Sequence, residues 1–281
     1  MILPVALKNI LDDNLSGSVT LLNRLMIALE NELLNPELDP ATFISYVEIF
    51  RKKLELFTVV RHFCDELVLT HTISVRNDPA KSLEFISNYR QFWENAPVKI
   101  LANLQKYLDL NNRTIMLHSN SGTLREVFRL MTKQENKIHF YQTLSAPMEE
   151  GKIQARDLAA MGYRVTLIAD AMAAEKLKSC DYLVLAADQL RSHSFINKVG
   201  TYQMAAAAQE LNVPVLLLTE SRKLNLHKEE SSFEDRSRDP AELGVDIQHQ
   251  NIHIENRYLE EIPRRLVTKI ITEREDMDLI E

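Results

Sequence analysis

The sequence predicts an α/β protein in which an all-helical N-terminal domain, residues 1–110, precedes a Rossmann-like parallel-sheet domain, residues 111–281. Glycine usage indicates the division, because five of the six glycines follow residue 110 and only Gly17 precedes it. After Asn112, short apolar runs alternate with helical stretches, which is typical of right-handed βαβ units around a parallel sheet. A chain of 281 residues is long enough for two such domains.

The first 110 residues predict helices near 17–34, 40–71 and 79–107. Apolar residues between Val19 and Leu33 recur at three- and four-residue spacing, so they share one helical face. The pairs Asp39-Pro40 and Asp78-Pro79 each indicate a helix start. An aspartate N-cap accepts free N–H groups there, and proline is tolerated at the first helical position.

The second half predicts five strands, at 114–118, 138–142, 164–168, 182–186 and 213–218. The helices between them are predicted at 122–132, 151–161, 171–178 and 199–211. Residues 222–246 are highly charged and poor in core residues, so we expect a long solvated loop. A last strand near 251–255 and a helix near 263–272 complete the predicted domain.

Composition excludes several classes of protein. The formal net charge of −7 argues against a nucleic-acid surface or an anionic membrane as partner, since both attract clustered Lys and Arg. No apolar run reaches the roughly 18 residues of a membrane span, and the N-terminus has no signal-peptide pattern. Two cysteines are too few for a disulfide framework or a cysteine-based zinc site. We therefore expect a cytoplasmic protein.

Motifs for metals and cofactors do not occur in the sequence. It contains no H-E-x-x-H, no G-x-G-x-x-G and no G-x-x-x-x-G-K-[ST]. No serine lies in G-x-S-x-G, which argues against an α/β-hydrolase. We expect neither a metal ion nor a cofactor.

Small and polar residues follow the first predicted strand. In a parallel sheet, the residues just past the carboxyl ends of the strands share one crevice. Ser119, Asn120, Ser121 and Gly122 would let backbone N–H groups of the next helix face an anion there. The alternative is that Asn120 or Ser121 only caps that helix, and caps are far commoner than ligand sites.

Asp188 ends the apolar run YLVLAAD and is our candidate acid or base. Burial in an apolar setting would raise its pKa and suit it to proton transfer. The alternative is a carboxylate that caps a helix or binds nearby backbone. We expect Asn197, Lys198 and Gly200 to start the next helix beside it. Lys198 would then either pair with Asp188 or share an anionic ligand with it.

Several ordered blocks carry a family resemblance. TIMLHSNSG resembles a strand ending in T-H-C-N-x-G, PMEEG the end of E-x-R-P-x-x-E-G, and YLVLAAD…INKVGT the pattern V-x-V-G-A-D…x-N-K-I-G-T. LLLTESRKL resembles a segment ending in S-F-K-F, and SGSVTLLNRLMIALE a block R-G-A-x-x-I. The chain thus resembles the superfamily that joins the alpha, beta and delta regulatory subunits of eukaryotic initiation factor 2B to two isomerases. These enzymes act on methylthioribose-1-phosphate and ribose-1,5-bisphosphate.

The resemblance implies a helical domain before a Rossmann-like domain, a homodimer formed through the latter, and a site for a phosphorylated small molecule. It assigns the catalytic aspartate to Asp188. The catalytic cysteine of the isomerases is replaced by Ser119, and two arginines by Ser16 and Ala146. A serine hydroxyl is a far weaker acid than a thiol, and neither Ser16 nor Ala146 replaces an arginine–phosphate contact. The ligand-binding residues that remain are Gly17, Ser119–Gly122, Asn197, Lys198 and Gly200.

Two functions follow from this pattern. We expect a non-catalytic binding or assembly protein on the isomerase scaffold, like the regulatory subunits, with a degenerate pocket for a sugar phosphate or nucleotide and a protein partner. The alternative is a divergent aldose–ketose sugar-phosphate isomerase that uses Asp188 as acid or base.

Overall fold

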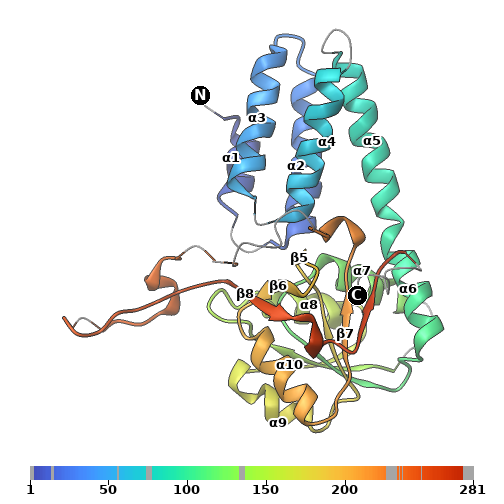
Figure 1. Ribbon diagram of the computed structural model, residues 1–281, viewed down its shortest axis with the longest axis vertical. Helices are drawn as coiled ribbons and strands as arrows, with labels where there is room; N and C mark the ends of the chain where they lie inside the picture. Colours follow the sequence, from blue (N-terminus) through green and yellow to red (C-terminus); the bar gives the residue numbers. More distant parts are fainter. Residues whose placement is uncertain are drawn as a thin grey trace. The chain divides into compact units, whose positions relative to one another are not determined.

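The computed structural model describes residues 3–13, 16–55, 57–73, 78–132, 137–225, 233, 235, 237–247 and 249–274. Its contacts divide the chain into two units, Met1–Pro97 and Val98–Glu281. The first unit is helical and the second contains the sheet (Figure 1). The predicted fold class is confirmed. Among the described residues, no helix is both long and apolar enough to cross a bilayer.

The helical unit contains five described helices: α1 Val5–Leu11, α2 Ser18–Leu33, α3 Pro40–Lys53, α4 Thr58–Ile73 and α5 Pro79–Glu94. Both predicted helix starts are confirmed. The carboxylate of Asp39 accepts from Thr42 N, that of Asp78 accepts from Ala80 N, and a proline follows each at the first helical position. The stretch 40–71 divides into α3 and α4, and α1 was not predicted.

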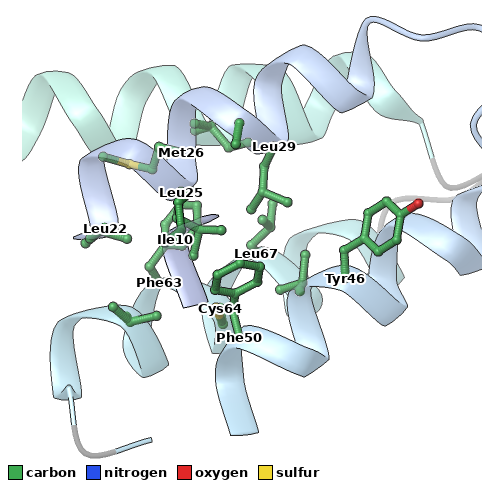
Figure 2. Close-up of a cluster of buried hydrophobic side chains, with 14 of the residues drawn as sticks. Ile10, Leu22, Leu25, Met26, Leu29, Tyr46, Phe50, Phe63, Cys64 and Leu67 are labelled. Atoms are coloured by element: carbon green, nitrogen blue, oxygen red, sulfur yellow. The ribbon is translucent and has the colours of Figure 1, made fainter. Parts of the chain in front are cut away.

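The apolar face of α2 forms the centre of the helical unit. Leu22, Leu25, Met26 and Leu29 are buried against side chains from the neighbouring helices (Figure 2). These partners include Phe50 of α3 and Phe63, Cys64 and Leu67 of α4. The three- and four-residue spacing read from the sequence therefore does mark the buried face.

The predicted helix 79–107 is interrupted at Asn95, the C-cap of α5, and continues as α6 Ala96–Tyr107. Ile100, Leu101 and Leu104 of α6 pack into a core of the α/β unit. The contacts therefore divide the chain between Pro97 and Val98, whereas the sequence placed the boundary after residue 110. That these two parts are separate domains stays a prediction.

Six of the described strands form a parallel sheet: β1 Thr114–Leu117, β2 His139–Thr143, β3 Arg164–Ile168, β4 Tyr182–Leu185, β7 Val215–Leu218 and β9 Lys269–Ile271. Their order across the sheet is β3-β2-β1-β4-β7-β9, and every neighbouring pair is parallel. The connections are α7 Gly122–Met131, α8 Gly151–Ala160, α9 Ala173–Leu177 and α10 Thr201–Glu210. The order reverses between β1 and β4, as in doubly wound folds.

Alternate residues of the central strands enter two separate cores. Ile115 and Leu117 of β1 pack with α6, α7 and α8, whereas Met116 packs with α9 and α10. The same alternation separates Leu216 from Leu217 in β7. Since side chains of a strand point alternately to its two faces, the sheet is a middle layer between two layers of helices.

The C-terminal part of the prediction is wrong in two places. Residues 251–255 form no strand; the strand here is β8 Leu259–Pro263, which pairs antiparallel with β6 Ser194–Lys198. Residues 263–272 form no helix, but the 3-10 turn η5 Arg264–Leu266 followed by β9. Apolar residues at 266, 267, 270 and 271 have helical spacing, yet Pro263 ends β8 and only three residues pair with β7.

A second sheet was also not predicted. Strand β6 pairs with β5 Gln189–Leu190 on one side and with β8 on the other. Asn197 and Lys198 therefore end a strand, and the next helix starts only at Thr201. We expected residues 222–246 to be a solvated loop. At its start this is wrong, because Arg222, Lys223 and Asn225 are buried. Residues 226–232, 234 and 236 of that loop lie outside the described residues.

Candidate functional site

The carboxyl ends of β1 and β4 lie side by side where the strand order reverses. This is the position at which open α/β sheets bind their ligands. The residues that follow the strands here are His118–Gly122 after β1, Ser145 after β2, Asp170 after β3, Asp188 after β4 and Thr219–Lys223 after β7. We call this region the strand-end site.

His118 is fully buried at the strand-end site. It belongs to a chain of hydrogen bonds in which each donor can be assigned. Its Nε2 lies 2.9 Å from the carbonyl oxygen of Val199, which can only accept, so Nε2 carries the proton. Nδ1 therefore accepts from Thr143 Oγ1 at 2.7 Å. Thr143 Oγ1 in turn accepts from Ser145 Oγ at 3.1 Å, and Ser145 Oγ accepts from Ser119 N at 2.8 Å.

Burial lowers the pKa of His118 to about 4, so its ring is neutral near pH 7. Gly200 lies against this ring with a φ of 99°. A Cβ added to Gly200 would be 3.3 Å from His118 Cε1, tighter than an ordinary contact. The predicted ligand-binding residue Gly200 therefore has a structural role at this position.

Ser119 has a φ of 68°, which is rare for a residue with a side chain. Its hydroxyl donates to Glu150 Oε1 at 3.1 Å, and the other carboxylate oxygen, Oε2, accepts from Lys198 Nζ at 3.0 Å. Glu150 and Lys198 are both buried. Burial raises the pKa of Glu150, although the two hydrogen bonds oppose this effect.

Lys198 thus pairs with Glu150 and not, as one interpretation of the sequence had it, with Asp188. Its ammonium also lies 5.0 Å from the ring centre of Tyr258. The side chain of the preceding residue, Asn197, donates from Nδ2 to Thr201 Oγ1 at 3.0 Å, at the start of α10. Both predicted residues are therefore committed to contacts within the chain.

Asp188 is half-buried, and its backbone N–H donates to the carbonyl oxygen of Ile196. The charge of Asp188 acts on Lys223, whose Nζ donates to the carbonyl oxygen of Ala187 at 2.7 Å. Burial lowers the pKa of Lys223, while Glu220 and Asp188 act in the opposite direction. The structure therefore brings Asp188 together with Lys223 at the end of β4.

The end of β7 contributes a second group of buried charges. Arg222 pairs with Glu220, whose other carboxylate oxygen accepts from Thr123 Oγ1 at 3.0 Å. The backbone N–H of Ser221 donates to Glu273 Oε2 at 2.9 Å, and its hydroxyl donates to Glu273 Oε1. The hydroxyl of Thr219 is buried and has no hydrogen-bond partner among the described residues.

The turn at 119–122 shows the helix cap that one interpretation of the sequence gave, and the anion site stays a prediction. Ser121 is the N-cap of α7, because its Oγ accepts from Leu124 N at 3.3 Å. Its own N–H donates to Gln154 Oε1 at 2.7 Å. The Oδ1 atom of Asn120 is buried and unpartnered within the described part of the chain, and Gly122 is the first residue of α7. Gly17 is the N-cap of α2 in the helical unit.

Ala146, at one of the lost arginine positions, adjoins a carboxylate. The N–H groups of Ser145 and Ala146 both donate to Asp170, each at 2.7 Å. Among the described residues, no group of three or more His, Cys, Asp or Glu side chains could hold a metal ion.

Sequence reasoning gave no role in the site to His118, Glu150 or Lys223. Each was within a block already quoted, in TIMLHSNSG, PMEEG and LLLTESRKL. The signal available was that His118 is the last residue of a predicted strand, while Glu150 and Lys223 follow predicted strands by eight and five residues. The contacts of Glu150 with Ser119 and Lys198, and of His118 with Val199, join positions 31 to 81 residues apart, which sequence spacing does not reveal.

The sequence model of the initiation factor 2 subunit family matches residues 48–275. Ribose 1,5-bisphosphate isomerase of Methanocaldococcus jannaschii is 29% identical over 187 residues, which are 64% of this chain and 60% of the relative. Methylthioribose-1-phosphate isomerase of Bacillus pumilus is 27% identical over 194 residues, 66% of this chain and 55% of the relative. The chain therefore spans little more than half the length of these relatives.

The solved structures include one of similar length. Translation initiation factor eIF-2B of Pyrococcus horikoshii OT3 superimposes with a TM-score of 0.78 over 96% of both chains. Its sequence identity of 21% supports a shared fold and no more.

Proposed function

The chain belongs to the initiation factor 2 subunit family, and from this we propose that it is a cytoplasmic, non-catalytic binding or assembly subunit that keeps a weak anion site. The observation that carries this proposal is the Ser119–Glu150–Lys198 contact. Ser119 replaces the thiol of the isomerases, and its proton is directed at Glu150. The ammonium that would face a phosphate is neutralised by the same carboxylate.

Charge balance supports the same proposal. The charged groups described above at the strand ends comprise five carboxylates, Asp170, Asp188, Glu150, Glu220 and Glu273, and three cations, Lys198, Arg222 and Lys223. Two of these cations pair with carboxylates. A doubly phosphorylated sugar would enter a region with more negative than positive groups. Each lost arginine contact lowers affinity by about 1.5–3 kcal/mol, so two lower it by about a hundredfold or more.

Lys223 is the cation that we expect to hold the remaining anion. It donates to a backbone carbonyl, whereas Lys198 and Arg222 donate to carboxylates. Calorimetric titration with inorganic phosphate and AMP should give dissociation constants of about millimolar size. Lys223→Met should remove this binding. Lys178→Met is the matched control, because Lys178 precedes β4 and lies toward the opposite end of that strand. Equal loss in both variants would contradict the assignment.

The catalytic part of the proposal is tested with ribose 1,5-bisphosphate and methylthioribose 1-phosphate. We expect no turnover by the wild-type protein. We expect activity to appear only when Ser16→Arg, Ser119→Cys and Ala146→Arg are combined. Wild-type turnover that Asp188→Asn abolishes would overturn the proposal.

A second candidate, a divergent isomerase, is favoured by one observation. The buried Glu150, whose pKa is raised, touches the hydroxyl that replaces the thiol, so Glu150 is a second proton-transfer group for Asp188 to work with. This enzyme would lose its activity in both Glu150→Gln and Asp188→Asn. Retained activity in Glu150→Gln would exclude it.

Members of this family form oligomeric complexes. We propose that this chain forms a homodimer through the α/β unit, with a C₂ axis, and binds a protein partner. Light scattering at micromolar concentration should give twice the mass of one chain. A monomer at that concentration would refute the homodimer and leave the anion site untouched.

A further inference from the structure

An extended segment before β8 projects from the α/β unit and exposes apolar side chains. We call residues 239–255 the arm; in Figure 1 it runs outward from β8 at the left of the view. Its described residues are exposed throughout, except that Glu242 and Ile254 are half-buried. Four apolar side chains on it are exposed: Leu243 by 38%, Val245 by 42%, Ile247 by 53% and Ile252 by 48%.

The base of the arm is firmly held. The buried carboxylate of Asp235 accepts from the N–H groups of Tyr258 and Leu259 at 2.7 and 2.9 Å. Arg238 N donates to the carbonyl oxygen of Asn256, and Asn256 Nδ2 donates to that of Asp239. The arm therefore leaves the unit and returns to it at one pinned point. Hydrogen bonds therefore hold both ends of the segment that exposes these apolar residues.

The chemistry of the arm defines the surface that it fits. Isolated exposed apolar residues are ordinary, but four within ten positions of one projecting segment indicate a protein contact. The arm contains Asp239, Glu242, Asp246 and Glu255 and no Lys or Arg. An anionic membrane would repel it, whereas an apolar surface bordered by basic residues would attract it.

The edge strand β3 of the same chain has that character. It is the outermost strand of the parallel sheet on its side and exposes Arg164 and Leu167. Met172, in the 3-10 turn η2 Asp170–Met172 that follows β3, is also exposed. Lys178 is exposed at the end of α9. An open edge also offers backbone groups to an extended segment.

We propose that the arm of one copy packs along the β3 edge of a second copy, so that a symmetric dimer contains two reciprocal arm contacts. This inference rests on the proposed homodimer and assigns its interface. A specific interface uses about 20–30 residues on each partner, and the arm supplies more than half of the lower figure. Because the contact joins an arm to an edge, each chain gives one arm and receives one.

Substitutions on the two surfaces test the proposal. The arm variant combines Val245→Lys, Ile247→Lys and Ile252→Lys, and the edge variant combines Leu167→Lys and Met172→Lys. Each should weaken the dimer by at least about 100-fold in sedimentation velocity, since several buried apolar contacts are lost. The control, Val5→Lys with Ile27→Lys and Leu34→Lys, changes exposed apolar residues of the helical unit and should leave the dimer intact. Circular dichroism establishes that each variant is folded.

Mixing the two variants gives the sharpest result. In a mixed dimer, the intact arm of the edge variant meets the intact edge of the arm variant, so one of the two contacts is restored. We expect dimer to reappear in the mixture but not in either variant alone. A folded arm variant that stays dimeric would overturn the proposal, although the homodimer itself would stand. An edge variant that stays dimeric while the arm variant dissociates would place the arm on another surface and overturn the β3 assignment. A monomeric wild-type protein would refute the homodimer itself.

Discussion

The helical unit and the strand-end site bury opposite kinds of side chain. Among the described residues of the helical unit, the buried polar groups are Ser18, Thr58, His71 and Ser82, and none is a carboxylate, lysine or arginine. The strand-end site buries Glu150, Lys198, Glu220, Arg222 and Lys223 within one region. The first region is stabilised by packing. The second has to satisfy every charge that it removes from water.

This difference bears on where a functional site is to be sought. Replacing a buried ion pair by apolar side chains of similar volume is often neutral or stabilising, so such pairs are weak evidence for stability. Buried charges at a switch point, held by directed hydrogen bonds, are expected where an anion is recognised. The helical unit offers no comparable group among its described residues.

The largest effect is expected in the helical core. Phe63 is fully buried, and its ring packs against those of Phe85 and Tyr89. Phe63→Ala should lower the free energy of unfolding by about 3–5 kcal/mol, measured by urea denaturation. Phe92→Ala, at an exposed position on α5, should change it by no more than about 0.5 kcal/mol. Similar losses in both variants would mean that packing does not distinguish these positions.

Breaking the buried ion pair of Lys198 and Glu150 is expected to lower the free energy of unfolding slightly less. Lys198→Met leaves Glu150 without its cation and should cost about 3 kcal/mol, the lower end for such pairs, because Ser119 still donates to the carboxylate. Adding Glu150→Gln should recover much of the loss. Arg129→Met, which breaks an exposed pair with Glu126, should cost less than about 1 kcal/mol. A double variant as unstable as the single one would show that the charge is not the cause.

The smallest effect is the contribution of His118 to the pH dependence of the free energy of unfolding. The pKa of His118 is about 4 in the folded chain, and an unfolded histidine has a pKa of about 6.5. Between these values the unfolded chain binds a proton that the folded chain does not, so stability falls as the pH is lowered from 6.5 to 4. The contribution reaches about 3 kcal/mol at most.

Other groups alter the same curve, so a variant is needed to isolate His118. Burial also lowers the pKa values of His71 and His139, which act in the same direction, and the raised pKa of Glu150 acts in the opposite one. The free energy of unfolding of His118→Gln should therefore depend less on pH than that of the wild type. Parallel curves for the two proteins between pH 4 and 6.5 would contradict the neutral, buried assignment.

Much of the fold follows from local sequence. The starts of α3 and α5 were found from Asp-Pro pairs, and the strands β1 to β4 and β7 from apolar runs, because caps and buried strands have strong local signals. The small sheet was missed because β6 ends in Asn197 and Lys198 and pairs with Glu260 and Glu261 of β8. Polar residues of this kind give a strand no local signature.

The candidate site was predictable as a place but not as a set of contacts. Strand ends located Ser119 and Asp188, since parallel strands bring their carboxyl ends to one edge. The partner of Lys198 was not predictable, because Glu150 and Asp188 both lie near strand ends and only the fold decides between them. The chain from Ser119 to His118 depends on side-chain geometry across β1 and β2.

Tyr258 belongs to both the base of the arm and the surroundings of Lys198. Its backbone N–H is bound by Asp235, its hydroxyl donates to Glu242, and its ring faces the ammonium of Lys198. Tyr258 therefore contacts both places directly. By thermodynamic reciprocity, any shift of the Lys198–Glu150 pair that favours the dimer is itself favoured by dimer formation to the same extent.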